Sequence, residues 1–419
     1  MPGNMEKQFT AQDQQFMKQA LELAARSVAL ASPNPCVGAV LVDERGAVVG
    51  QGFHTYEARK HAEVLALEEA GVRARGATLY VNLEPCSHVG RTGPCADALM
   101  AAGVKRVYAA MSDPNPAVRG QGFGKLQAAG VEVHAGLLES EARKLNESFA
   151  KYIRGKIPLV TLKTAMTLDG KIAPPSSERM QGDLGSLAAT GGWITSPEAR
   201  SHAHEMRHAN DAILVGVGTI IADDPLLTDR TGLARRRPLL RVILDSRLRL
   251  PLNSRVVKTA RGDVIVFCCF AEEHKRQELE ARGVVVEQVP MPAPPGDGTI
   301  LFPGSVPVSD GRPDLERVMA ELGRREITSV IIEGGAMVNW AALSARIVDK
   351  VFLYYAPKIL AGTGSVPFSL GPGYRRMSEA AHVTALTLHR FGEDFAVEGY
   401  LHDPYADEPS TAPRLVQDS

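Results

Sequence analysis

The sequence contains few cysteines, few aromatic residues and no long apolar run. Five of its 419 residues are cysteine and 5% are aromatic, while 44% are hydrophobic. No apolar run reaches the roughly 20 residues that cross a bilayer, and the N-terminal segment lacks the apolar core of a secretory signal. These absences argue against a membrane-spanning protein and against a secreted scaffold held by disulfides. We therefore expect a cytoplasmic protein with no membrane partner.

An excess of charge of one sign is also missing. Lys and Arg number 47 and Asp and Glu number 48, which gives a formal net charge of -1. The chain therefore has no general electrostatic attraction for nucleic acid, and a small molecule is the more natural ligand. The length exceeds that of one ordinary domain, so two domains are expected.

The first domain is predicted to be a layered α/β domain over residues 1–153, because helix and strand patterns alternate throughout it. Thr10 and Asp13 fit a capping box at the start of its first helix. A later helical stretch stops at Gly71, as a C-terminal glycine dictates. Residues 140–153 are predicted to form one closing helix.

The second domain is predicted over residues 157–403, where the pattern starts afresh. Seven strand candidates alternate with helical stretches, and an antiparallel pair of strands ends the domain. Two loops rich in Gly, Pro and Ser interrupt this pattern, at 174–192 and 291–311. Residues 404–419 are polar and are predicted to be a disordered tail.

Two cysteines of the first domain lie in the segment NLEPCSHVGRTGPCADAL, with eight residues between Cys86 and Cys95. Three explanations compete: a disulfide, a thiol nucleophile and two ligands of a metal. In a reducing compartment stable disulfides are rare, and paired cysteines more often bind metal or do chemistry. A catalytic zinc site needs a third protein ligand and leaves one position for water.

The order of residues around these cysteines favours zinc. His61-Ala62-Glu63, followed at a distance by Pro85-Cys86, has the arrangement of the zinc deaminases, in which the glutamate moves protons and does not bind the metal. We therefore predict one zinc per chain, bound by His61, Cys86 and Cys95, with Glu63 as the catalytic residue. A capping histidine beside two core thiols is the alternative.

Four segments of the first domain carry a family resemblance: SPNPCVGAVLV, GFHTYEARKHAEV, EPCSHVGRTGPCADAL and DPNPAVRGQGF. They closely resemble the pyrimidine deaminases of riboflavin biosynthesis, over nearly all of residues 10–150. The spacing of the two cysteines separates this family from cytidine and tRNA adenosine deaminases.

The resemblance implies a cytidine-deaminase-like α/β/α layered fold for the first domain. It also implies a substrate, 2,5-diamino-6-ribosylamino-4(3H)-pyrimidinone 5′-phosphate, which loses the amine at its pyrimidine C2. Five residues match positions that contact this substrate in the family: Asn34, His54, Arg91, Asp113 and Asn115. For the Asn and Asp residues beside proline, ordinary turn chemistry is the alternative.

The second domain has neither a metal-binding pattern nor a dinucleotide fingerprint. Cys268 and Cys269 lie within a strand pattern and are predicted to be core residues. The segment VGVGTI lacks the third glycine of the fingerprint, whereas IEGG, at 332–335, ends a strand before a helical stretch and is a plausible phosphate cradle. The residues alone predict an α/β domain with a glycine-rich strand end.

Further segments of the second domain are similar to a known family: LKTAMTLDGKIA, WITSPEAR, MRHANDAILVGVGTIIADDPLLTDR, VILDS, VIIEGG and KVFLYYAPKIL. They resemble the riboflavin-pathway reductases, which are related in fold to dihydrofolate reductase. The resemblance implies a dihydrofolate-reductase-like α/β domain that uses NADPH to reduce the ribosyl group of the deaminated product to ribityl. The chain as a whole thus resembles the bifunctional deaminase–reductases.

The resemblance also implies roles for individual residues of the second domain. The substrate positions are Lys163, Arg207, Leu227, Arg230 and Glu333. The cofactor positions are Met166, Asp169, Trp193, Thr219, Asp223, Ser246, Gly335, Ala336, Met337 and Val338. Core packing is the alternative for Trp193 and Leu227, and a solvated helix face is the alternative for Arg207.

Two other functions compete with the bifunctional enzyme. The long loop at 174–192 supplies Gly191 where the family often has a polar substrate contact, so the second domain is alternatively catalytically impaired or regulatory. The other competitor is a different nucleotide deaminase fused to a reductase. We further expect a homo-oligomer, as is common for two-domain enzymes.

Overall fold

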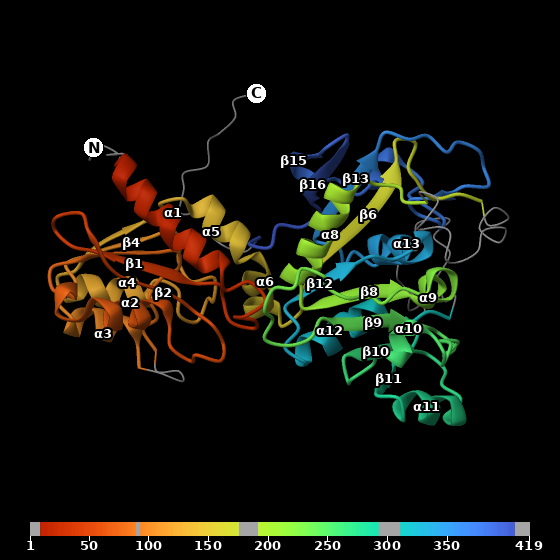
Figure 1. Cartoon of the computed structure of the whole chain (residues 1–419), viewed down its shortest axis with the longest axis horizontal. Helices are drawn as coiled ribbons and strands as arrows, with labels where there is room; N and C mark the ends of the chain where they lie inside the picture. The colour runs from red at the N-terminus through yellow and green to blue at the C-terminus, as the bar shows by residue number, and fades with distance from the viewer. Residues whose placement is uncertain (1–8, 89–92, 176–191, 293–310, 407–419) are drawn as a thin grey trace. The chain divides into compact units, whose positions relative to one another are not determined.

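The computed structural model describes residues 9–88, 93–175, 192–292 and 311–406. Arg91, Gly191, most of the two long loops and the tail beyond residue 406 lie outside these ranges, so the predictions made for them stay predictions. The chain divides into two units (Figure 1). The first comprises residues 1–155, 234–237 and 404–419, and the second comprises 156–233 and 238–403. None of the described helices is long and apolar enough to cross a membrane.

The first unit is built on a five-stranded sheet of order β2-β1-β3-β4-β5. The strands are β1 (Gly38–Val42), β2 (Val48–Phe53), β3 (Thr78–Val81), β4 (Arg106–Ala109) and β5 (Glu132–Ala135). β1 pairs antiparallel with β2 and β3, while β3, β4 and β5 run parallel. Every residue of β1 is buried, as expected of a strand covered on both faces.

Helices cover both faces of this sheet, as predicted for a layered domain. They are α1 (Ala11–Ala25), α2 (Ala62–Ala70), α3 (Cys95–Ala101), α4 (Gln121–Ala128), α5 (Glu139–Leu145) and α6 (Glu147–Gly155). α1 and α5 lie on one face, and α2, α3 and α4 lie on the other (Figure 1). The predicted capping box is confirmed at Thr10 and Asp13, and α2 ends at Gly71, whose φ is +56°.

The single closing helix predicted at 140–153 is wrong. Asn146 separates α5 from α6, because its backbone φ of −110° leaves the helical range. Its buried side chain crosses to the loop before β1, where Oδ1 accepts from Cys36 N at 2.8 Å and Nδ2 donates to Cys36 O at 3.1 Å. The break between the two helices thus allows the Asn146 side chain to hydrogen-bond two backbone groups of a distant loop.

The second unit is built on a nine-stranded sheet of order β11-β10-β9-β8-β12-β6-β13-β16-β15. Its parallel strands are β6 (Leu159–Thr167), β8 (Ala212–Gly216), β9 (Leu240–Leu244), β10 (Val264–Cys268), β11 (Val284–Gln288), β12 (Ser329–Ile332) and β13 (Lys350–Ala356). The predicted antiparallel pair is present as β15 (Thr384–Phe391) and β16 (Asp394–Tyr400). A small sheet of β7 (Lys171–Ala173) and β14 (Val366–Pro367) was not predicted.

Alternate residues of each central strand supply two cores. On β8, Leu214 packs into the core beneath α12 (Leu315–Arg324) and α13 (Ala336–Ser344). Ile213 and Val215 pack into the opposite core with α9 (Val217–Asp223), α10 (Arg255–Lys258) and α11 (Glu273–Glu280). α8 (Pro197–Ala209) covers β13 and β16 through a smaller cluster. Burial on both faces explains why these strands read as continuous apolar runs.

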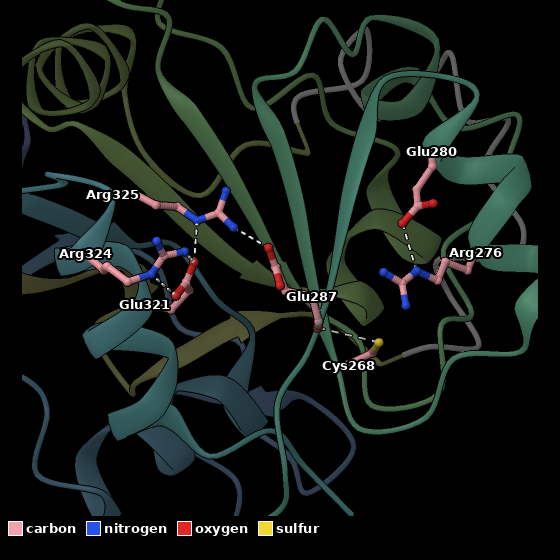
Figure 2. Close-up of polar contacts among 7 residues, drawn as sticks. All are labelled: Cys268, Arg276, Glu280, Glu287, Glu321, Arg324 and Arg325. Atoms are coloured by element: carbon pink, nitrogen blue, oxygen red, sulfur yellow. Dashed lines mark hydrogen bonds and ion pairs between the residues drawn. The ribbon is translucent and has the colours of Figure 1, made fainter.

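Short ionic contacts join exposed elements at the rim of this sheet (Figure 2). Arg325, just after α12, contacts both Glu321 of the same helix and Glu287 on β11. Cys268 at the end of β10 is buried, as predicted, and its Sγ lies 3.7 Å from the backbone oxygen of Glu287. Cys269 is only partly buried. Ion pairs near the surface contribute little to the free energy of unfolding, so the apolar cores provide most of the stability of the unit.

Residues far along the chain complete the first unit. In the segment 234–237, Arg236 donates its backbone N–H to Ala29 O at 2.9 Å and places its guanidinium 3.3 Å from the centroid of the Tyr56 ring. Tyr405, which the sequence prediction assigned to the disordered tail, is buried in the core of this unit. Its hydroxyl donates to the backbone oxygen of Arg143 at 2.8 Å.

Candidate active sites

Three secondary-structure boundaries in the first unit bring three potential metal ligands together. His61 is the residue before α2, Cys86 lies in the loop after β3, and Cys95 is the first residue of α3. His61 Nδ1 lies 3.2 Å from Cys95 Sγ and 3.5 Å from Cys86 Sγ. Within the described residues these three form the one group of three potential ligands whose donor atoms lie within 4.8 Å of one another. The predicted ligand set is therefore assembled.

The electrostatics of this group suit a cation. Hydrogen bonds from Cys95 and His61 lower the pKa of Cys86 to about 4, although burial opposes them. Cys86 and burial together raise the pKa of Cys95. One thiolate therefore forms readily, and a second beside it requires a positive charge. Two thiolates and an imidazole are the ligands that zinc prefers, so the residues fit the predicted metal.

Glu63 is the second residue of α2 and is buried beside this group. Only 3% of its surface is exposed, and its Oε2 has no hydrogen-bond partner within the described part of the chain. Burial raises the pKa of Glu63, even though His61 lowers it. A buried carboxylate oxygen without a partner is costly, and a water held by the metal would satisfy it. The position suits a group that exchanges protons with that water.

His54 and Asn34 lie beside the metal-ligand group. The His54 ring lies 5.5 Å from the His61 ring and is nearly perpendicular to it. His54 Nδ1 donates to Lys60 O at 2.9 Å, which leaves Nε2 to accept from Asn34 Nδ2 at 3.0 Å. The amide of Asn34 is thereby oriented, and its oxygen remains an acceptor for a ligand donor.

Asp113 and Asn115 follow β4, next to the cysteine loop. Burial raises the pKa of Asp113 to about 6, although an N–H from Asn115 lowers it; the charges of Glu84 and Cys86 raise it further. Asn115 is held in a turn, in which its Oδ1 accepts from Ala117 N at 3.2 Å. Asn115 therefore stabilises a turn, and this role is compatible with the predicted contact between Asn115 and the substrate.

Glu84 is a residue of this site that sequence reasoning missed. It is 4% exposed, two positions before the ligand Cys86, and four backbone N–H groups surround its carboxylate. The sequence could have indicated this role, because Glu84 lies between a buried strand and a metal ligand. A carboxylate buried at such a place needs hydrogen-bond donors from other segments.

The second unit contains a buried cluster formed by three of the predicted substrate residues. Glu333, after β12, accepts from Arg207 Nε at 2.6 Å and from Arg207 Nη2 at 2.9 Å, and its Oε2 lies 3.2 Å from Lys163 Nζ. Burial raises the pKa of Glu333, but the charges of Lys163 and Arg207 outweigh it and hold the pKa at about 2. Arg207 is therefore not on a solvated face.

The segment that holds the other two predicted substrate residues reaches this cluster through Thr228, whose backbone oxygen accepts from Arg207 Nη1 at 3.1 Å. Arg230 is exposed, and burial together with the charges of Arg207 and Arg230 lowers the pKa of His204. Leu227 is buried in the core with a φ of +56°, so the packing alternative holds for its side chain.

The predicted cofactor positions follow the carboxyl ends of parallel strands, which meet at one edge of the sheet. Thr219 follows β8, Ser246 follows β9 and Gly335 follows β12. Gly335 precedes α13, and no side-chain hydrogen bond from it caps this helix within the described residues. The first N–H groups of α13 are thus available to a phosphate. At Gly334, an added Cβ would lie 2.6 Å from Val338, so this turn needs glycine. The arrangement fits a phosphate-bearing cofactor.

Other cofactor positions have distinct surroundings. Trp193 is 54% exposed with the Arg200 guanidinium 4.8 Å from its ring, so the core-packing alternative fails for Trp193. Asp169 accepts from Thr167 Oγ1 at 2.6 Å and from Ala361 N at 2.8 Å, and thereby holds a turn. Met166 and Ala336 are buried, whereas Asp223 and Met337 are exposed.

Family models match both units. The cytidine and deoxycytidylate deaminase zinc-binding region matches residues 10–111, and the RibD C-terminal domain matches residues 158–397. The second match covers more than half of the chain.

Curated relatives and solved structures match nearly the whole length. The chain is 40% identical to the riboflavin biosynthesis protein RibD of Aquifex aeolicus over 92% of this chain and 97% of the relative, and 37% identical to that of Escherichia coli over 91% and 98%. A solved structure of Acinetobacter baumannii RibD matches with a TM-score of 0.76 at 34% identity, covering 93% of this chain and 98% of that chain. A Thermotoga maritima structure, named a diaminohydroxyphosphoribosylaminopyrimidine deaminase/5-amino-6-(5-phosphoribosylamino)uracil reductase, matches with a TM-score of 0.72 at 36% identity over the same shares.

Proposed function

The chain belongs to the RibD family of riboflavin biosynthesis, and on that premise we propose how its own residues carry the family's two reactions. It is a bifunctional enzyme, a zinc-dependent deaminase joined to an NADPH-dependent reductase. The observation that carries the first half is the meeting of His61, Cys86 and Cys95 beside the buried carboxylate of Glu63.

In the deaminase, we assign the exchange of water for the C2 amine of the pyrimidine to the site around Glu63. His61, Cys86 and Cys95 would hold a zinc ion, which would supply an activated water by lowering the pKa of that water. Glu63 takes the proton that this water loses as it attacks C2, and delivers a proton to the departing ammonia. Asn34, oriented by His54, contacts the edge of the pyrimidine, while Asp113 and Asn115 contact the rest of the substrate. Arg91 is assigned to the phosphate because guanidinium forms paired bonds to such oxyanions.

In the reductase, NADPH supplies the hydride that converts the ribosyl group to ribityl. Gly335 and Ala336 at the N-terminus of α13 would hold phosphates of the cofactor, together with Thr219 in α9 and Ser246 after β9. The exposed Trp193 lines the cofactor site. Arg207 and Arg230 hold the ribose phosphate, and Lys163 and Glu333 fix the sugar relative to the cofactor.

Replacement of Glu63 by Gln tests the assignment. The amide cannot accept a proton, so deamination should fall by several orders of magnitude while zinc stays bound and the deaminated intermediate is still reduced. Elemental analysis and separate assays of the two half-reactions provide the readouts. Glu22→Gln, at an exposed position of α1, is the matched control and should change none of them. Loss of zinc along with deamination would make Glu63 a structural residue instead.

We also propose a homo-oligomer and a cytoplasmic location. The edge strand β15 exposes Leu386 and Leu388 at 62% and 73%, and an exposed apolar edge strand is a natural site for pairing with another copy. Leu388→Asp should then lower the mass measured by sedimentation. A reducing compartment is supported by the need of the metal site for two thiolates.

A further inference from the structure

The loop between β4 and α4 has an unusual anchor. Glu84 lies in the loop after β3, and it accepts two backbone N–H groups from the loop between β4 and α4 and two from the first turn of α4. Oε2 accepts from Asp113 at 3.1 Å and from Gly120 at 2.9 Å; Oε1 accepts from Gly122 at 2.9 Å and from Phe123 at 3.3 Å. One buried carboxylate therefore binds both ends of the segment 113–123.

This carboxylate performs the task of a helix cap. The residue before α4 is Gly120, which has no side chain with which to cap the helix. Gly122 N and Phe123 N belong to the first turn of α4, whose free N–H groups attract negative charge. Glu84 supplies that charge from outside the helix, and the four donors offset the cost of burying it.

Because Gly122 has no side chain, the start of α4 can lie close to Glu84 and Pro85. A Cβ at this position would lie 1.9 Å from the backbone oxygen of Pro85 and 3.2 Å from Glu84 Cγ. Any side chain at Gly122 would therefore push the start of α4 away from the segment 84–86. Gly124, two residues further along the same helix, has nothing within 4 Å of an added Cβ.

The anchored segment carries Asp113 and Asn115, which are assigned above to the substrate. Asp113 N is bonded to Glu84, Asp113 Oδ1 accepts from Asn115 N at 2.8 Å, and Asp113 O accepts from Arg119 Nε at 3.2 Å. The same anchor is two residues from the metal ligand Cys86. Movement of Glu84 or of its donors would shift the substrate contacts relative to the metal.

We propose that Glu84 is a positioning residue of the deaminase, which together with Gly122 sets the distance between the substrate-contacting segment 113–115 and the metal ligand Cys86. This inference rests on the proposed roles of Asp113 and Asn115. Glu84 acts through the loop, so its loss should weaken substrate binding more than it slows the chemical step carried by Glu63.

The test compares Glu84→Gln and Gly122→Ala with Gly124→Ala in the full-length chain. Glutamine has the same shape but replaces one acceptor oxygen by an NH₂ group that opposes the backbone donors, whereas alanine at 122 leaves the charge and blocks the approach. For both variants we expect KM for the phosphorylated pyrimidine to rise by about tenfold or more, with a smaller change in kcat and with zinc and reductase activity retained. Gly124→Ala should behave as wild type.

A purely structural role gives a different pattern. Partial unfolding lowers the amount of active enzyme, so kcat per chain and zinc fall together while KM stays constant, and that result in the soluble variants would overturn the proposal. Unchanged kinetics in Gly122→Ala would overturn it too, even where Glu84→Gln fails to fold. If wild type does not deaminate this substrate, the proposed function fails; if wild type does and KM is unmoved in both variants, only the positioning role fails.

Discussion

Removal of the Arg207 guanidinium should destabilise the second unit, beyond any loss of substrate binding. Arg207 donates two hydrogen bonds to Glu333 and a third to the backbone oxygen of Thr228 at 3.1 Å. The side chains of Arg207 and Glu333 are only 17% and 12% exposed. Arg207→Ala therefore leaves a buried carboxylate with Lys163 as its remaining cation.

The size of this loss of stability follows from the pKa of Glu333. Its depression from the ordinary value of 4.5 to about 2 corresponds to about 3 kcal/mol of stability at neutral pH. Removal of one partner of a buried ion pair typically costs about 3–5 kcal/mol. Because Lys163 stays in place, we expect Arg207→Ala to lower the free energy of unfolding by about 2–3 kcal/mol at pH 7.

The Glu333 carboxyl also determines how the stability difference between wild type and Arg207→Ala changes with pH. A carboxyl whose pKa is depressed on folding stabilises the protein above its unfolded pKa, and this contribution is lost as the pH falls through the folded value. In the variant the pKa of Glu333 rises toward its ordinary value. The difference between wild type and Arg207→Ala should therefore shrink as the pH falls from about 4.5 toward 2.

Urea unfolding followed by tryptophan fluorescence measures this effect in the right unit, because both tryptophans, Trp193 and Trp340, belong to the second unit. A double-mutant cycle with Glu333→Gln isolates the ion pair. When Glu333→Gln is already present, removal of Arg207 should cost much less. An equal cost with and without Glu333→Gln, or a cost at pH 3 equal to that at pH 7, would refute the reasoning.

Three further outcomes are expected. Cys86→Ser should lose most of the roughly one zinc per chain found by elemental analysis of wild type; full retention would exclude Cys86 as a ligand. Arg230→Ala should raise the reductase KM for the phosphorylated intermediate by about ten- to a hundredfold and leave KM for the dephosphorylated compound nearly unchanged; equal losses on both would mean that Arg230 does not contact phosphate. Tyr80→Phe removes a 2.7 Å hydrogen bond to Asp13 and should lower the stability of the first unit by about 1–3 kcal/mol, measured by circular dichroism; no change would show that water replaces the hydroxyl.

The sequence predicted the metal-ligand group because its members are chemically specific and their neighbours set their positions. His61 and Cys95 stand at helix starts and Cys86 follows a strand, so the order of helix and strand patterns already brings them to one edge of the sheet. The seven parallel strands of the second unit were predictable for a related reason, since burial on both faces gives continuous apolar runs.

Contacts between distant side chains and backbone groups were not predictable. Nothing in a helical pattern over 140–153 indicates that Asn146 bonds the backbone at Cys36 and breaks the helix. In the same way, Arg207 has the spacing of a surface helix residue, and its pairing with Glu333 depends on two segments that lie 126 residues apart. The donors to Glu84 in the described structure come from the loop after β4 and from the start of α4, which lie 29 to 39 residues further along the sequence.

Two segments of the first unit, residues 234–237 and the segment that begins at residue 404, are synthesised long after the rest of that unit, and this affects when the unit can fold. Tyr405 occupies the core of a unit whose sheet is finished by residue 135, and residues 234–237 hold the loop around Ala29 and Tyr56. When residues 1–155 have been synthesised, the described strands and helices of this unit are all present in the chain, but neither of these two segments is. Domains ordinarily fold as units while synthesis proceeds, yet one core residue of the first unit, Tyr405, is made only after almost all of the second unit. A gene cut after residue 155 should therefore yield a fragment that collapses, exposes the surface meant for Tyr405 and aggregates more readily than the full chain.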